Sequence, residues 1–317
     1  MKYLRRWVWV FVLFATAALA EVPDWSVQQV RLTQATAVFT RLRGQIQQKG
    51  SAAAKALDRQ VTLIVDTSGA PEPRSTIDYN GRKVVVPDAF FAKTVNVARL
   101  LQLARGAGDL ECVETYKAHM ENTGSRTGPE GYLDLAVSIC ETFKARLPLN
   151  QEQELRAQRE LEATLIFAYL HELGHQYHNH QRVPMPSNVE TKENQCAFLR
   201  VRNLRRQMEY EADSFAVDML VHLGQVGLLL STTNLWMPPP LEPDPAQMAS
   251  NGMLAQRLAG HPYSPFRFVR ILDQASEALS GRAGTGAQTL QIIREMIEVE
   301  RRATALIAEN DAELNPC

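Results

Sequence analysis

The sequence predicts a mostly helical α+β protein with a small β-sheet. Two observations predict this class. Long segments place apolar residues at helical spacing, whereas runs of β-branched residues occur in only two places, near residues 60–69 and 81–91. The chain has 317 residues, of which 45% are hydrophobic and 22% charged, so it can bury a substantial core and is not globally disordered.

The first twenty residues have the features of a secretory signal peptide. A basic start, MKYLRR, precedes an apolar run that ends in Ala18-Leu19-Ala20. The run is shorter than the ~20 residues that cross a bilayer as a helix. We therefore expect cleavage before Glu21 rather than an uncleaved anchor, and residues 21–317 are predicted to form a single exported domain.

The charge balance argues against a nucleic-acid partner. The chain has 34 Lys and Arg and 35 Asp and Glu. Residues 1–20 hold three of the basic residues and no acid, so their removal would leave 31 against 35, a formal charge of −4. No basic stripe with interleaved aromatic residues is present, which makes nucleic-acid binding unlikely on physical grounds.

All four cysteines follow the leader, and an even number in an exported chain favours disulfides. Among the three possible pairings we favour Cys112–Cys140 with Cys196–Cys317, because the first pair brackets one polar insertion. No cysteine has the C-x-x-C spacing that is typical of a zinc site.

The first half of the chain is predicted to place helices around the two strands. Residues 24–60 have helical spacing, and so does the segment TVNVARLLQLARG that follows the strands. The two strands are separated by a stretch rich in Pro, Gly, Ser and Asp, and Pro87 closes the second one. Residues 105–150 are interpreted as an insertion.

The second half of the chain is predicted to be mostly helix. One helix runs from Asn150 or Gln151 to Gln181, with Asn150 as its N-cap, and another runs from about Val189 to Leu223. Residues 237–245, MPPPLEPDP, form a Pro-rich loop that could act as a lid or rim. Two more helices are expected, from Ser264 onward and over about 285–310.

The segment HELGH, residues 171–175, carries the clearest chemical signal. His171 and His175 are four residues apart on the predicted helix, so both imidazoles project from one face and could bind one zinc ion. Glu172 is rotated by about 100° and would flank the zinc without ligating it, where it would meet a water molecule. Gly174 has no side chain and would let another element approach this helix closely.

Two further histidines follow the motif, His178 and His180. If the helix continues straight, His178 is too far along the axis to share the metal with His171, and His180 faces the opposite side. We therefore expect both to be solvated residues at a helix end. Gln181 occupies the position where a metzincin carries its third ligand, which excludes metzincin-type ligation.

A catalytic zinc needs a third protein ligand. Glu209 lies 34 residues after His175, and a helix hairpin broken at VPMP could return it to the metal. Asp213 is four residues further on the same face and could accept the outer N–H of a ligand histidine, which would fix its tautomer. Glu211 competes for the ligand position, and spacing alone does not exclude it.

Three blocks in this order resemble the zinc metallopeptidase family of the CAAX prenyl endopeptidases, HtpX and BepA. They are HELGHQYHNH, EYEADSFAVDML and GHPYSPFRFVRIL, and together they cover about 100 residues. The family shows HExxHxxxxH, then E-x-x-A-D-x-x-A, then an H-P motif before an Arg-containing helix. The strand segment reads YNGRKVVVPDAFF where the family carries a Pro-Gly-Gly signature, so the chain resembles a divergent member.

The resemblance implies an HExxH zincin-type fold with Glu209 rather than Glu211 as third ligand. It implies further that Asp213 accepts the outer N–H of a ligand histidine. It also implies that Lys83–Pro87 is an edge strand that pairs with an extended polypeptide substrate. His261 of the H-P motif would reach the active site and stabilise the oxyanion or gate the metal.

We therefore expect an exported, periplasmic zinc endopeptidase that hydrolyses extended or misfolded envelope proteins. One zinc ion per chain would bind His171, His175 and Glu209, Glu172 would act as the general base, and His261 would assist. The alternative is a zinc-binding envelope chaperone or assembly factor, with assembly partners in the envelope. In that alternative the 237–245 loop or His261 would block a latent site.

Overall fold

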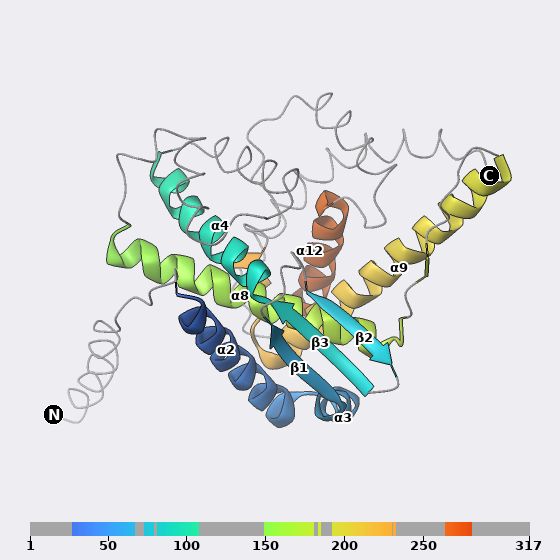
Figure 1. The fold of residues 1–317 in the computed structure, drawn as a ribbon, viewed down its shortest axis with the longest axis horizontal. Coiled ribbons are helices and arrows are strands. Elements are labelled where there is room, and N and C mark those ends of the chain that lie inside the picture. The colour runs from blue at the N-terminus through green and yellow to red at the C-terminus, as the bar shows by residue number, and fades with distance from the viewer. Residues whose placement is uncertain are drawn as a thin grey trace.

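The structure, a computed structural model, describes residues 27–66, 73–78, 81–107, 149–180, 183–184, 192–229, 231–232 and 264–280 (Figure 1). These residues form a mostly helical α+β fold with one three-stranded sheet, as predicted. The elements follow in the order α2 (Gln28–Lys49), α3 (Ala52–Gln60), β1 (Val61–Asp66), β2 (Arg74–Asp78), β3 (Gly81–Pro87), α4 (Asp88–Ala107), α8 (Gln151–Tyr177), α9 (Lys192–Leu223) and α12 (Ser264–Ser280).

The helical region predicted over residues 24–60 is two helices, α2 and α3, and the break has a local cause. Gly50 has an extended backbone and donates its N–H to Ile46 O at 2.8 Å, which ends α2. A Cβ at Gly50 would lie 2.6 Å from that same carbonyl oxygen, so this close approach requires glycine. Ser51 then caps α3 by accepting a hydrogen bond from Ala54 N.

The sheet has the strand order β1-β3-β2, which corrects the expected position of Lys83–Pro87. β3 pairs with β1 in parallel over Arg82–Pro87 and with β2 in antiparallel orientation over Gly81–Val85, so it is the central strand and has no free edge over Arg82–Val85. The sequence analysis missed β2 because the strand is short and lies within a stretch rich in turn-forming residues. The edges of the described sheet are therefore β1 and β2.

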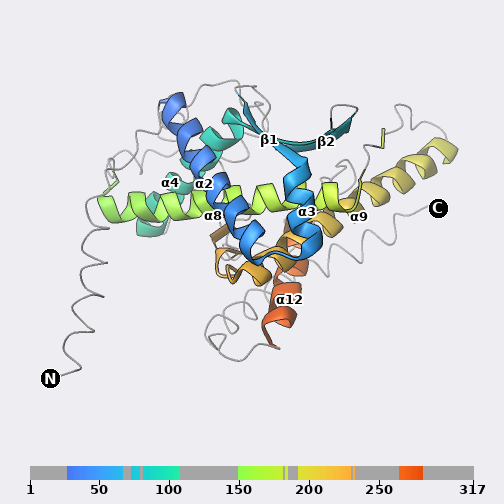
Figure 2. The same cartoon turned by 90° about the horizontal axis from the view of Figure 1, so that it is seen from below.

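α8 is the central helix of the fold. It contacts α2, α3, α4, α9, β2 and β3, and Figure 2 shows the sheet on one side of it and α12 on the other. Every residue from Ala163 to Gly174 is buried, and a helix that is buried all round must be surrounded by other elements. The segment that carries HELGH is thus held from several sides.

The two ends of α8 are defined by local signals. Asn150 accepts a hydrogen bond from Gln153 N, and the Gln153 side chain accepts from Asn150 N, which completes a capping box at the predicted N-cap. The helix ends at Tyr177, before the predicted end at Gln181. Asn179 adopts a left-handed conformation with φ 56°, a backbone geometry that asparagine tolerates better than most residues.

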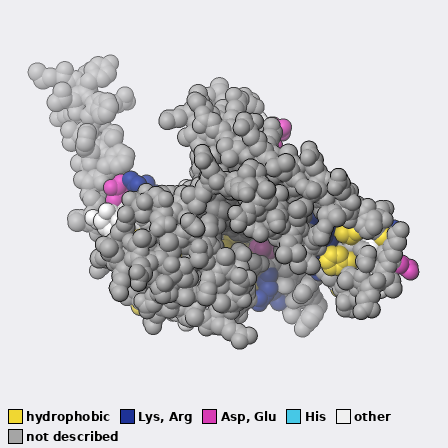
Figure 3. Space-filling model, turned by 90° about the horizontal axis from the view of Figure 1, so that it is seen from above, with side chains coloured by type: hydrophobic (Ala, Val, Ile, Leu, Met, Phe, Trp, Pro, Cys, Tyr) yellow, Lys and Arg dark blue, Asp and Glu magenta, His cyan; other side chains and the backbone are white. Residues whose placement is uncertain are grey.

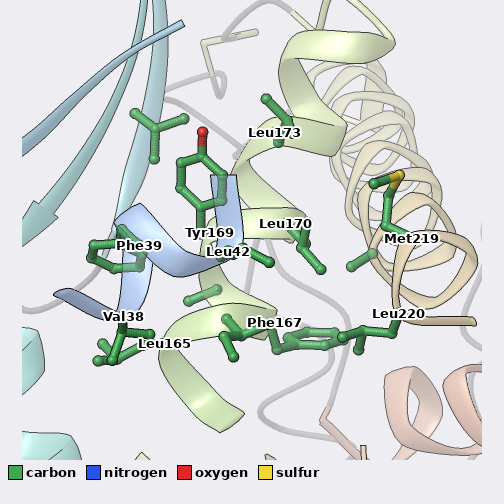
Figure 4. Packing of buried hydrophobic residues seen from close by; sticks show 14 of the residues in the cluster. Val38, Phe39, Leu42, Leu165, Phe167, Tyr169, Leu170, Leu173, Met219 and Leu220 are labelled. Atoms are coloured by element: carbon green, nitrogen blue, oxygen red, sulfur yellow. The ribbon is translucent and has the colours of Figure 1, made fainter. Parts of the chain in front are cut away.

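The core joins α8 to α2 on one side and to α9 on the other (Figure 4). Phe39 of α2 packs against Tyr169 of α8, with ring centroids 5.7 Å apart. The labelled members of the cluster are Val38, Phe39 and Leu42 from α2, Leu165, Phe167, Tyr169, Leu170 and Leu173 from α8, and Met219 and Leu220 from α9.

Buried polar groups in this region are paired across elements. Tyr169 donates its hydroxyl to Asp58 at 2.8 Å, and Arg43 donates to the same carboxylate at 3.0 Å, which links α8, α3 and α2. Arg31 donates to Asp88, the first residue of α4, at 2.8 Å and 2.9 Å. An acid at this position also interacts favourably with the positive end of the helix.

Several expectations fall outside the described residues. They are the signal peptide over 1–20, most of the 105–150 insertion, the 237–245 loop, the last helix and His261. Cys196 of α9 is disulfide-bonded, while Cys112, Cys140 and Cys317 lie outside the described residues, so the pairing stays a prediction. Among the described helices, none combines the length and the apolar character that crossing a membrane requires.

The described side chains on the face in Figure 3 include acids, bases and hydrophobic residues. Acidic and basic groups appear at separate places there, and among the described side chains neither sign forms a continuous patch.

Candidate metal centre

Three predicted residues converge between α8 and α9. His171 Nε2 and His175 Nε2 lie 3.1 Å apart, and the Glu209 carboxylate lies 3.3 Å from the first and 3.5 Å from the second. The two histidines are one turn apart on α8, as the i, i+4 spacing requires, and Glu209 faces them from α9. These three residues form a group that could hold a metal ion.

The close contact of α8 and α9 explains how Glu209 reaches the histidines. Gly174 lies against Ala212, and a Cβ at Gly174 would be 2.8 Å from Ala212 O and 2.9 Å from Ala212 Cα. No side chain larger than hydrogen fits there without moving one helix. Gly174 therefore sets the helix separation, as its position within the motif suggested.

The ligand atoms are spaced as a tetrahedral metal site requires. Ligand atoms about 2.0–2.1 Å from one zinc ion at tetrahedral angles lie about 3.3–3.4 Å from one another. The two imidazole nitrogens are 3.1 Å apart, and the Glu209 carboxylate places Oε2 3.3 Å from His171 Nε2 and Oε1 3.5 Å from His175 Nε2, so each of these contacts is close to that value. Two imidazoles with one carboxylate are also a known donor set for catalytic zinc, so the residues fit this metal.

His171 is oriented by Asp213, which lies one turn after Glu209 on α9. The Nδ1 atom of His171 is 2.9 Å from Asp213 Oδ1. Because an ionised carboxylate only accepts hydrogen bonds, Nδ1 is the donor, and Nε2 is directed at the site. Burial alone would lower the pKa of His171, but the hydrogen bonds with Asp213 and Glu209 outweigh it and raise the pKa to about 10. This imidazole therefore has a high affinity for a proton or for a competing cation.

Arg267 of α12 completes the surroundings of Asp213, and the sequence analysis gave it no role. It donates from Nε to Asp213 Oδ2 at 2.8 Å and from Nη2 to Asp213 Oδ1 at 2.7 Å, and its Nη1 lies 3.4 Å from Glu209. Burial would raise the pKa of Asp213, but the charge and hydrogen bonds of Arg267 together with the contact to His171 outweigh it and lower the pKa, so Asp213 stays ionised. A site with several buried acids needs a buried basic residue, and this requirement is the signal that could have pointed to Arg267.

Glu172 lies beside the three potential ligands and is itself buried. Burial raises the pKa of Glu172, while the adjacent histidines and a hydrogen bond with Ser75 of β2 lower it in part. A carboxylate with a raised pKa, next to a candidate metal centre, has the properties of a general base. Ser75 also shows that strand β2 passes close to this part of α8.

The structure corrects the expectation that His180 is a solvated bystander. Its Nδ1 lies 2.9 Å from His175 Nδ1, and its Nε2 lies 2.8 Å from Glu211 Oε2. The expectation assumed that α8 continues to Gln181. Because the helix ends at Tyr177 and Asn179 reverses the chain, His180 folds back over the last turn.

His178, His180 and Glu211 form a second group whose ligand atoms lie within 4.8 Å of one another and could hold a metal ion. His178 is exposed, as expected, and its ring stacks on His180 with centroids 5.3 Å apart. Burial lowers the pKa of His180. Glu211, left open as a rival to Glu209, therefore faces the second group rather than the first.

No family model, curated protein or solved structure matches this chain. The resemblance to the zinc metallopeptidase family thus rests on the three sequence blocks. The geometry brings together His171, His175, Glu209, Glu172 and Asp213, whereas the predicted role of His261 falls outside the described residues.

Proposed function

We propose that this protein is a zinc-dependent endopeptidase, in which His171, His175 and Glu209 hold the metal and Glu172 is the general base. The observation that carries the proposal is the convergence of His171 Nε2, His175 Nε2 and the Glu209 carboxylate, with contacts of 3.1 to 3.5 Å, next to a buried carboxylate with a raised pKa. A bound zinc ion would supply Lewis acidity, which polarises a carbonyl group and makes water more acidic.

The charges of the site support a divalent cation. Ionised Glu209 and Asp213 carry two negative charges and Arg267 balances one of them, while burial raises the pKa of Glu172. Buried charges are costly unless they are compensated, so one further positive charge is needed, and a second one when Glu172 ionises. A divalent ion at the ligands would provide them, and His171 can hold one proton there instead.

Each residue then has a defined task. Glu172 accepts a proton from the attacking water and delivers it to the leaving amine. Asp213 accepts the Nδ1–H of His171 and keeps its Nε2 lone pair directed at the site. Arg267 holds Asp213 in place with two hydrogen bonds and keeps its carboxylate ionised.

The substrate class we propose is an extended polypeptide. An edge strand can bind such a chain through backbone hydrogen bonds. Since β3 is central, β2 is the better candidate edge, because β1 contacts α2 and α3 on the described part of the fold and β2 carries Ser75 next to Glu172. The leader sequence makes envelope proteins the expected substrates, in a periplasmic location.

The test is a pair of matched substitutions on α8. Glu172→Gln removes the base but keeps the shape of the side chain, so we expect zinc content equal to wild type and loss of cleavage of an unfolded protein. Glu162 is on the same helix as Glu172 and forms a partly exposed ion pair with Arg41 of α2. Glu162→Gln should therefore retain both zinc and cleavage. Zinc per chain and newly formed amino termini are measured on the same preparations.

Cleavage by Glu172→Gln at the wild-type rate would show that the base is assigned wrongly. If the wild-type protein binds zinc but cleaves no extended substrate, the result would favour the chaperone or assembly factor.

A further inference from the structure

We infer that His180 and Glu211 are positioning residues for the ligand His175 and that they orient it through a hydrogen-bonded relay. The inference rests on the proposed metal centre and extends it to residues outside the three ligands. It also means that the second group of His178, His180 and Glu211 serves the first site rather than binding a metal ion of its own.

The relay is a continuous chain of short contacts. His175 Nδ1 lies 2.9 Å from His180 Nδ1, and His180 Nε2 lies 2.8 Å from Glu211 Oε2. The rings of the two histidines meet edge to face, with centroids 5.1 Å apart. Only 9% of the His180 side chain is exposed, whereas 38% of the Glu211 side chain is, so the contact with His175 is better shielded from water than the contact with Glu211.

The backbone holds His180 in this place. Its N–H donates to His175 O at 2.9 Å, which fixes the turn onto the last turn of α8. Arg82 of β3 donates to Gln176 O at 2.6 Å and ties the same turn to the sheet. The left-handed Asn179 reverses the chain between these anchors. The return of His180 is thus determined by several independent contacts.

Counting protons gives the relay one direction. A neutral imidazole carries one N–H. If His175 Nε2 binds a cation, its proton is on Nδ1 and donates to His180 Nδ1. The proton of His180 is then on Nε2 and donates to Glu211. Each donor in this arrangement faces an acceptor.

The same count separates the relay from a second metal site. Since His180 Nδ1 faces His175, a second cation would need the lone pair of His180 Nε2. The proton of His180 would then be on Nδ1, and His175 would have to accept it and carry its own proton on Nε2. That proton would point at the first site. The two sites therefore require opposite tautomers, and occupation of the first disfavours the second.

Both ligand histidines are consequently held by a carboxylate. Asp213 contacts His171 directly, and Glu211 acts on His175 through His180. Partners of this kind fix ring orientation and raise ligand basicity, and their loss typically weakens metal affinity about 10- to 100-fold.

The test measures Zn²⁺ affinity and stoichiometry of the purified protein by competition with a chelating indicator. His180→Ala should weaken Zn²⁺ binding about 10- to 100-fold. His180→Asn should recover much of the loss, because Asn Oδ1 and His Nδ1 both lie two bonds from Cβ and both accept a hydrogen bond. Glu211→Gln should cause a smaller loss than His180→Ala.

Two controls separate positioning from a general structural effect. His178→Ala removes the neighbouring exposed histidine, whose ring stacks on His180 but which makes no hydrogen bond in the relay, and should leave affinity close to that of wild type. Glu211→Gln should have no added effect in a His180→Ala background, because the two residues act in series. Thermal unfolding of each metal-free variant shows whether the fold is retained.

Wild-type protein should bind one Zn²⁺ per chain. Binding of two, with His178→Ala and His180→Ala each reducing the number to one, would overturn the relay in favour of a second site. A folded His180→Ala variant with wild-type affinity would also overturn it while leaving the proposed function intact. Absence of Zn²⁺ binding by wild type would overturn both.

Discussion

Glu172 is the residue on which the proposed chemistry depends, and opposing influences set its pKa. Burial raises the pKa, and the charges of His171 and His175 and the hydrogen bond from Ser75 lower it. The base must be ionised to accept a proton, so activity is expected to rise with pH through this pKa. The contact with Ser75 offers a way to move it without touching a potential ligand.

Ser75→Ala should shift the acidic limb of kcat/KM to higher pH. The substitution removes a hydrogen bond that favours the ionised carboxylate, so the pKa of Glu172 rises further. Thr76→Ala is the control, because neighbouring side chains on a strand point to opposite faces. An acidic limb that stays in place or moves to lower pH would contradict the role of Glu172 as the base.

At the scale of elements, the pairing of α8 and α9 assembles the site. Its ligands come from two helices that share one close contact, at Gly174 and Ala212. A change that separates the helices should weaken metal binding even though it alters no ligand.

Gly174→Ala is expected to lower the free energy of unfolding by about 1–3 kcal/mol, because overpacking outweighs the better helix propensity of alanine. It should also weaken Zn²⁺ affinity, since α9 carries Glu209 away from the histidines. Gly44→Ala in α2 is the matched control. A Cβ at Gly44 meets nothing within 4 Å, so that variant should be more stable by up to about 1 kcal/mol. Equal stability of the two variants would contradict this account of the helix contact.

The helical elements, and the polar residues that share one face of each helix, could be predicted because they depend on local periodicity. The i, i+4 spacings of His171 with His175 and of Glu209 with Asp213 require only that each segment is helical. The return of His180 could not be predicted this way, because it depends on where α8 ends. Asn179, a residue that tolerates left-handed backbone, is the one local hint.

Features that depend on tertiary structure were missed. Strand β2 is short and mostly polar, and it gains its place by pairing with β3. Arg267 is 54 residues from Asp213 in sequence, so only the fold of α12 against α9 reveals the contact. The position of β3 at the centre of the sheet follows from the same missing strand.

At the scale of the whole molecule, the Asp213–Arg267 pair joins α12 to α9 and should make stability sensitive to acid. Burial would raise the pKa of Asp213, but Arg267 and His171 lower it below the usual value. A depressed folded-state pKa stabilises the protein above the unfolded-state pKa of about 3.9, and this stabilisation is lost as pH falls below that value.

Asp213→Asn should therefore lower the free energy of unfolding of the metal-free protein by about 3–5 kcal/mol at neutral pH, because it removes the negative charge that lies closest to a buried arginine. Denaturant unfolding across a pH series measures the difference from wild type. The difference should shrink below pH ~4. A difference that is the same at every pH would show that the charge of Asp213 does not contribute.

The central claim is that the cation held by His171, His175 and Glu209 is required for peptide-bond hydrolysis. Its most direct test uses protein stripped by a chelator and reloaded with one equivalent of Zn²⁺, with new amino termini counted on an unfolded protein substrate. We predict no cleavage by the stripped protein, cleavage after reloading, and none by reloaded Glu209→Gln. Cleavage by stripped protein, or by Glu209→Gln at the wild-type rate, would contradict the claim.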